Sequence, residues 1–193
     1  AKKGKDTSMW LAIESVKRKD CDIVISAGNT GALLVISKLN LKMIENIDKP
    51  ALSALWPNKK GMSVVLDLGA NIDCSSKNLF DFSIMGASLY KSLYPSETPN
   101  VALLNIGSEE LKGNETIKET FKILKEKKTE DFNFEGYIEG NQLMNGNVNV
   151  IVSDGFTGNV ALKTAEGTAN FITSELKKTM TGNIMGKISS LLN

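Results

Sequence analysis

Four short polar loops carry the residues that could do chemistry in this chain. They place glycine beside Asn, Ser, Thr or Asp, and each lies between an apolar run and a helical one, at 26–31, 67–73, 105–113 and 153–159. Glycine lets the backbone approach a ligand closely, and unpaired N–H groups at a helix N-terminus favour an anion. A single loop of this kind is more often only a turn with a helix cap. Four of them together indicate a site for an anion such as phosphate.

The candidate anion-binding residues in these loops offer small polar side chains or the bare backbone of glycine. They are Gly28, Asn29, Thr30, Gly31, Asn71, Asp73, Asp154, Gly155, Thr157 and Gly158. A carboxylate repels an anion, so the aspartates are expected to orient the donors. Lys112 could supply an ammonium group and Asn159 an amide. Spacing alone favours plainer roles, because Lys112 can pair with Glu109 or Glu115 and Asn159 can cap a helix.

The amino-acid composition and the missing sequence motifs disfavour several kinds of catalytic and metal site. The chain has no histidine, which removes the commonest general base and metal ligand. No Gly-x-Gly-x-x-Gly or Walker pattern is present, and no Ser-His-Asp or Cys-His arrangement can be built. Cys21 and Cys74 lack the spacing of a metal site. We therefore expect no metal and no cofactor, and the net charge of +1 does not favour nucleic acid as a partner.

Alternating apolar and helical stretches must position these loops. Strands are expected at 21–25, 50–56, 62–68, 101–106, 132–138 and 148–152. A first helix is expected to begin at a cap at Ser8, a second to run from the 26–31 loop up to Ile44, and three more to span 75–94, 114–127 and 159–180. This alternation is typical of βαβ units, so the expected fold class is α/β with a mostly parallel sheet covered on both faces. The loops would then meet at the carboxyl edge of the sheet. We interpret 1–193 as a single α/β domain truncated at both ends.

The last stretch, 176–193, is expected to form a protruding amphipathic helix. Its apolar residues recur at helical spacing and are flanked by lysines; they include Leu176, Met180, Ile184 and Ile188. A basic amphipathic helix can lie on an anionic membrane surface. The pattern fits a dimer contact or ordinary core packing at least as well.

The loops in this order resemble the PlsX-type phosphate acyltransferases. The matching stretches cover nearly the whole chain and include Ser-Ala-Gly-Asn-Thr-Gly-Ala-Leu at 26–33, Lys-Pro-Ala-Leu at 49–52, Leu-Asp-Leu-Gly-Ala-Asn-Ile-Asp at 66–73, Leu-Asn-Ile-Gly-Ser-Glu-Glu at 104–110, Lys-Gly-Asn-Glu at 112–115 and Ser-Asp-Gly-Phe-Thr-Gly-Asn-Val-Ala-Leu-Lys at 153–163. Members of this family are considerably longer than this chain.

The resemblance implies a three-layer α/β/α fold similar to that of isocitrate and isopropylmalate dehydrogenases. It also implies a cytoplasmic homodimer in peripheral contact with the membrane. Its reaction would transfer a fatty acyl group from acyl carrier protein to inorganic phosphate, without a cofactor, and the acyl phosphate would feed phospholipid synthesis. Under this resemblance Lys112 and Asn159 become the catalytic candidates.

Three alternatives remain open from the sequence. The first is a phosphotransacetylase-like enzyme that uses coenzyme A thioesters. The second is a dehydrogenase of the related fold, which the missing dinucleotide pattern disfavours. The third is a non-catalytic module that binds an anion or an acyl group.

Overall fold

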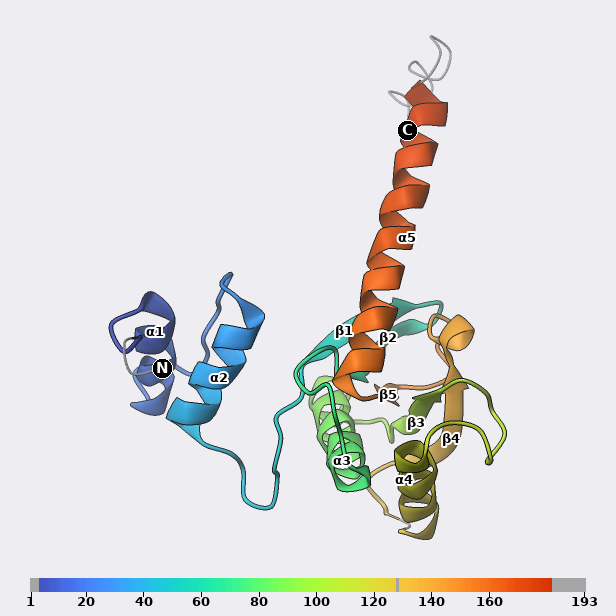
Figure 1. Ribbon diagram of the computed structural model, residues 1–193, viewed down its shortest axis with the longest axis horizontal. Helices are drawn as coiled ribbons and strands as arrows, with labels where there is room; N and C mark the ends of the chain where they lie inside the picture. Colours follow the sequence, from blue (N-terminus) through green and yellow to red (C-terminus); the bar gives the residue numbers. More distant parts are fainter. Residues whose placement is uncertain (1–3, 128, 182–193) are drawn as a thin grey trace.

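The computed structural model describes residues 4–127 and 129–181 (Figure 1). Its helices are α1 (Ser8–Lys17), α2 (Thr30–Leu41), α3 (Ser76–Leu93), α4 (Glu115–Glu126) and α5 (Gly155–Thr181), with a short 3-10 turn at Gly140–Gln142. Its strands are β1 (Ser53–Asn58), β2 (Gly61–Leu66), β3 (Asn100–Asn105), β4 (Asn133–Glu139) and β5 (Val150–Val152). No helix in these residues is long and apolar enough to cross a membrane.

The strands form one sheet in the order β1-β2-β5-β3-β4. All neighbouring pairs are parallel except β1 and β2, which form an antiparallel pair at one edge. The central strand β5 is short and aliphatic, and its Ile151 lies opposite Val65 of β2 and Ala102 of β3. The expected mostly parallel α/β sheet is confirmed.

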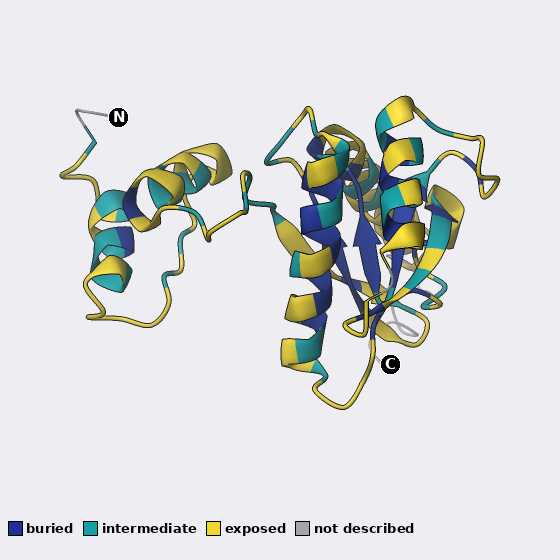
Figure 2. Ribbon diagram, turned by 90° about the horizontal axis from the view of Figure 1, so that it is seen from below, coloured by how far each residue is buried: buried dark blue, intermediate teal, exposed yellow. Residues whose placement is uncertain are grey.

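Helices cover both faces of the sheet, with α5 on one side and α3 and α4 on the other, which gives three layers (Figure 1). The strands between them are largely buried (Figure 2). Side chains alternate between the two faces along each strand. Val64, Val101 and Val150 point to the face covered by α3 and α4, whose buried Phe82 and Ile117 complete that core. The opposite face, with Val65, Ala102 and Ile151, packs against Trp56 of β1, Leu143, and Ala161, Leu162 and Ala165 of α5. The continuous apolar strands of the sequence follow from this burial on both faces.

Two local expectations about element ends are wrong. Thr7, not Ser8, caps α1, and its hydroxyl oxygen accepts a hydrogen bond from the N–H of Trp10 at 3.4 Å. Strand β1 continues through Pro57 to Asn58. Proline is tolerated there because β1 is an edge strand, where a missing N–H costs no hydrogen bond within the sheet.

The expected strand at 21–25 is also wrong. The segment has no strand partner among the described residues, and Ile23 and Ile25 are 73% and 88% exposed. An apolar run becomes a strand only where a neighbouring strand pairs with its N–H and C=O groups, and the five-stranded sheet forms without it. Helices α1 and α2 pack against each other beside the sheet (Figure 1).

Candidate active site

A buried carboxylate organises the loop that follows β2. Asp67 is fully buried, and its Oδ1 accepts hydrogen bonds from the backbone N–H groups of Leu52, Gly69 and Ala70 at 3.0, 3.1 and 2.9 Å. Its Oδ2 accepts from the backbone N–H and the side-chain amide of Asn71, at 2.8 and 2.7 Å. Hydrogen bonds to a charged acceptor are stronger than neutral ones. They therefore hold this loop in one conformation.

The start of α5 packs tightly against the same loop. The N–H of Gly155 donates to the carbonyl oxygen of Asn71 at 2.8 Å. A Cβ atom at Gly155 would lie 2.6 Å from that oxygen, and a Cβ at Gly158 would strike the carbonyl oxygen of Asp67. Both glycines are therefore needed for the contact between helix and loop, whether or not they also bind a ligand.

Asp154 caps α5, and Asn159 does not. The Asp154 carboxylate accepts from the N–H and the hydroxyl of Thr157, both at 2.8 Å, and α5 begins at Gly155. The expectation of an Asn159 cap is therefore wrong. Its side-chain Nδ2 donates instead to the carbonyl oxygen of Leu68 at 3.1 Å. Within residues 4–127 and 129–181 the amide makes no other bond, so its second N–H is available to a ligand.

Helices α2 and α5 and the loop after β2 enclose a pocket of about 410 Å³, which we name the leucine pocket. Its apolar wall consists of Leu33, Leu34, Leu52, Leu68 and Leu162. Its polar groups include those of Thr30, Gly31, Asn159 and Lys163, and the hydroxyl of Ser37. The N-terminus of α2 thus opens into the pocket beside an amide and a lysine, a combination that suits an anion next to an apolar group.

A second pocket, of about 320 Å³, lies on the other side of the loop, and we name it the aspartate pocket. Its lining includes Asp73, Asp154, Thr157, Asn114 and Cys74. Lys49 brings a cation to this region, because its ammonium donates to the carbonyl oxygen of Asp73 at 2.6 Å. Two carboxylates make this pocket less suited to an anion than the leucine pocket.

The candidates from the sequence thus divide between two adjacent pockets, where one shared cradle was expected. Gly28 and Asn29 line neither pocket. Asn29 caps α2, with its Oδ1 accepting from the N–H of Ala32 at 3.0 Å, and the N–H of Gly28 donates to the Ser26 hydroxyl at 3.1 Å. Asn71 lies between the pockets and donates to the carbonyl of Pro50 at 2.7 Å, so its amide serves the loop itself.

Lys112 is exposed on the loop after β3. The backbone of this loop is held by Asn105, whose Nδ2 donates to the carbonyls of Gly107 and Lys112, both at 3.1 Å. No ion pair of Lys112 occurs in the described part of the chain, where Glu115 pairs instead with Lys118 at 3.1 Å. Lys112 lies close in sequence to Asn114 of the aspartate pocket but lines neither pocket.

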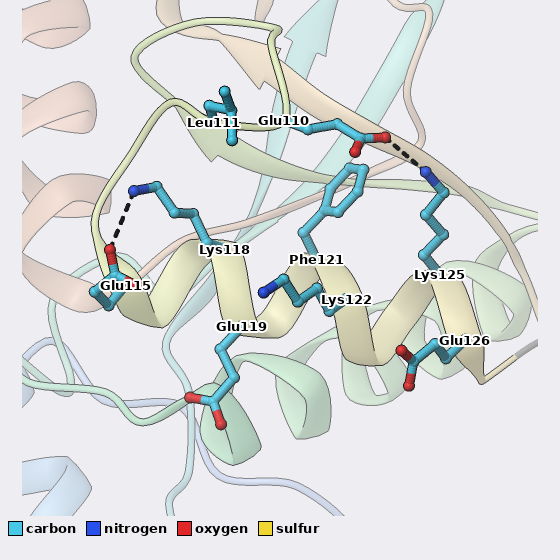
Figure 3. Close-up of a pocket in the computed structure, with 9 residues that line it drawn as sticks. All are labelled: Glu110, Leu111, Glu115, Lys118, Glu119, Phe121, Lys122, Lys125 and Glu126. Atoms are coloured by element: carbon cyan, nitrogen blue, oxygen red, sulfur yellow. Dashed lines mark hydrogen bonds and ion pairs between the residues drawn. The ribbon is translucent and has the colours of Figure 1, made fainter.

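A larger hollow of about 640 Å³ lies between α4 and the 110–111 turn (Figure 3). Lys118 reaches Glu115 and Lys125 reaches Glu110, at 3.1 and 2.6 Å. Four glutamates and three lysines line this hollow, so it carries no basic excess for an acidic partner. Such a mixture of charges is typical of a solvated helix face.

Burial makes Cys74 a poor nucleophile. Desolvation raises the pKa of its thiol, and the sulfur donates to the carbonyl oxygen of Asn71 at 3.6 Å. The reactive species is the thiolate, whose fraction at neutral pH falls as the pKa rises. A covalent acyl-cysteine intermediate is therefore disfavoured at this site.

Two residues next to these loops did not stand out in the sequence. Lys163 lines the leucine pocket with Asn159, and a spacing of one helical turn could have linked them. Asp67 looked like one more loop aspartate, because no pattern shows that five N–H groups converge on its carboxylate.

A family model described as a fatty acid synthesis protein matches residues 1–193. The chain belongs to this family. It is 83% identical over 193 residues to a phosphate acyltransferase of Pelagibacter ubique strain HTCC1062, a match that covers all of this chain and 58% of the relative. It is 47% identical over 191 residues to the phosphate acyltransferase of Caulobacter vibrioides, covering 99% of this chain and 53% of that protein. These names confirm the resemblance to PlsX-type phosphate acyltransferases, and the chain spans somewhat more than half the length of these relatives.

The fold of this fatty acid synthesis family member also has solved counterparts. EutD phosphotransacetylase from Staphylococcus aureus superposes with a TM-score of 0.63 and 15% identity, over 84% of this chain and 56% of its own. A phosphotransacetylase from Streptococcus pyogenes gives a TM-score of 0.62 and 16% identity, over 83% and 54% of the two chains. At such identities the likeness supports the fold alone.

The residues expected to contact a membrane are only partly within the described chain. Leu176 and Met180 of α5 are 56% and 45% exposed. Ile184 and Ile188 lie outside the described residues. The exposed part of α5 extends away from the sheet (Figure 1).

Proposed function

We propose that the protein transfers a fatty acyl group from an acyl carrier protein thioester to inorganic phosphate. The observation that carries this proposal is the 83% identity over the whole chain to a phosphate acyltransferase. The leucine pocket adds support, because it combines a helix N-terminus, an amide and a lysine with an apolar wall. A thioester and phosphate react directly, so the absence of histidine is no obstacle.

In the proposed reaction a phosphate oxygen attacks the thioester carbonyl carbon. A carbon–oxygen bond forms, the carbonyl becomes a tetrahedral oxyanion, and the carbon–sulfur bond then breaks. The proton of hydrogen phosphate ends on the departing thiolate, which balances the reaction as acyl phosphate plus thiol. No acyl-enzyme intermediate and no external base are needed.

Chain groups would position the reactants and stabilise charge. The second N–H of Asn159 would donate to the developing oxyanion. Backbone N–H groups at Thr30 and Gly31 would bind phosphate. The ammonium of Lys163 would join them by leaving its exposed ion pair with Glu166. Asp73, Asp154 and Thr157 would shape the neighbouring pocket, and Lys112 would add positive charge from the loop after β3.

An acyl-phosphate assay on the complete protein tests this function. We expect palmitoyl-carrier protein to be consumed only when phosphate is present, with acyl phosphate trapped as its hydroxamate. Palmitoyl-coenzyme A should react more slowly, since the acidic carrier protein would add a docking surface. Consumption of the thioester without phosphate, or a preference for coenzyme A, would contradict the proposal.

We further propose a cytoplasmic homodimer that contacts the membrane reversibly through α5. The support is the exposure of Phe171, Leu176 and Met180 on a helix that extends from the sheet. Replacing both Leu176 and Met180 by serine is expected to reduce co-sedimentation with anionic vesicles at least tenfold. Unchanged vesicle binding in that variant would reject the membrane contact, and sedimentation velocity of the complete protein would test the dimer.

A further inference from the structure

The leucine pocket has a polar end and an aliphatic wall, and the attack by phosphate requires only the polar end. Its aliphatic wall is built from four separate segments: Leu33 and Leu34 of α2, Leu162 of α5, Leu52 before β1 and Leu68 after β2. Leu68 is 1% exposed, and the other four are partly buried. A phosphate ion would use only the polar end, so the aliphatic wall needs another occupant.

The polar end and the aliphatic wall meet at the proposed reaction centre. Asn159 and Leu162 lie about one turn apart on α5 and both line the pocket. The Asn159 amide is fixed by its bond to the carbonyl of Leu68, a residue of the same wall. If the carbonyl of an acyl group lies at the amide, the alkyl chain attached to it would therefore extend directly along the leucines.

An alkyl chain suits this wall better than the other parts of a thioester substrate. A pantetheine arm carries amide groups that need hydrogen-bond partners, and burying them beside leucines without partners is unfavourable. Lys163, the charged residue at the polar end of the described pocket, would contact the phosphate and therefore offers no partner to these amides along the leucine wall. The volume of about 410 Å³ lies within the range of ligand pockets in proteins.

We infer that the leucine pocket binds the acyl chain of the thioester, with the carbonyl at Asn159 and the methylenes along Leu34, Leu68 and Leu162. This inference rests on the proposed function for its substrate and adds the place where the chain lies. Each methylene that becomes buried should strengthen binding about fourfold. The pocket would therefore set the preference for acyl-chain length.

Filling the pocket should change chain-length preference. In the complete protein, Leu34→Trp is expected to lower kcat/KM for palmitoyl-carrier protein at least tenfold more than for hexanoyl-carrier protein. The matched control is Leu39→Trp on the same helix, because Leu39 lines a different groove, between α1 and α2. The control should leave the ratio of the two substrates unchanged. An equal loss for both substrates in Leu34→Trp, as expected for a pantetheine occupant, would overturn the inference.

Photocrosslinking provides a second measurement that needs neither turnover nor a variant. A palmitoyl thioester with a diazirine in the chain should label peptides containing residues 33–37 or 159–163 of the wild-type protein. Labels confined to other segments would overturn the placement of the chain. A wild-type protein that forms no acyl phosphate would contradict the proposed function, whereas the crosslinking pattern tests the inference without turnover.

Discussion

Replacing Asp67 with asparagine is expected to lower the free energy of unfolding by about 3–5 kcal/mol. The carboxylate is fully buried and accepts N–H groups from Leu52, Gly69, Ala70 and Asn71 on both oxygens. Asparagine keeps one acceptor oxygen and turns an NH₂ group toward the remaining donors. At least two partly buried N–H groups would then lose their acceptor.

Chemical denaturation of the complete protein, followed by circular dichroism, measures this effect. The matched control is Asp73→Asn in the same loop, because Asp73 is exposed. In the described part of the chain its carboxylate accepts no hydrogen bond, and its backbone carbonyl accepts one from Lys49. The control should change stability by less than about 0.5 kcal/mol. A loss below about 1 kcal/mol in Asp67→Asn would mean that the loop does not depend on this carboxylate.

Replacing Asn159 with alanine is expected to lower kcat for acyl-phosphate formation about 10²–10³-fold. The variant removes the N–H that we propose donates to the oxyanion, an interaction that strengthens only as negative charge develops. KM for phosphate should change much less, since the variant keeps the proposed phosphate donors, which are the N–H groups of Thr30 and Gly31 and the ammonium of Lys163. Steady-state kinetics with palmitoyl-carrier protein and phosphate separates the two parameters.

Val160→Ala provides the control for a general effect on α5. Val160 is the next residue along the helix, is 51% exposed and lines neither pocket. It should retain wild-type kcat and a similar melting temperature. Lys112→Ala, measured in parallel, should lower kcat at least tenfold if its ammonium reaches the reactants. Wild-type rates in both Asn159→Ala and Lys112→Ala would reject the catalytic assignment.

The sheet was predictable because its central strands are buried on both faces. Runs such as 62–66 and 101–104 are almost continuously apolar, and polar loops follow them, so their type and order could be predicted from the sequence. The run at 21–25 has the same composition and is exposed coil. An apolar composition indicates that a segment can be buried, whereas the formation of a strand also requires a neighbouring strand to pair with.

The site was predictable in its residue types and less so in its geometry. Asn159, Thr30 and Gly31 were candidates, and the structure places them around one pocket. The division into two pockets follows from the path of the loop held by Asp67, which separates Asp73 and Asp154 from the leucines. No spacing along the chain encodes that separation, since it depends on hydrogen bonds between segments far apart in sequence.

The sequence by itself determined the family, the α/β class and the polar groups available for catalysis, because these depend on residue type and local order. Only the tertiary structure decided that Asp67 holds the loop, that Asn159 is bound to Leu68 and does not cap α5, and that leucines from α2 and α5 share a pocket with it. Buried N–H and C=O groups need hydrogen-bond partners, and here those partners lie far away in the sequence. They come within bonding distance only in the folded chain.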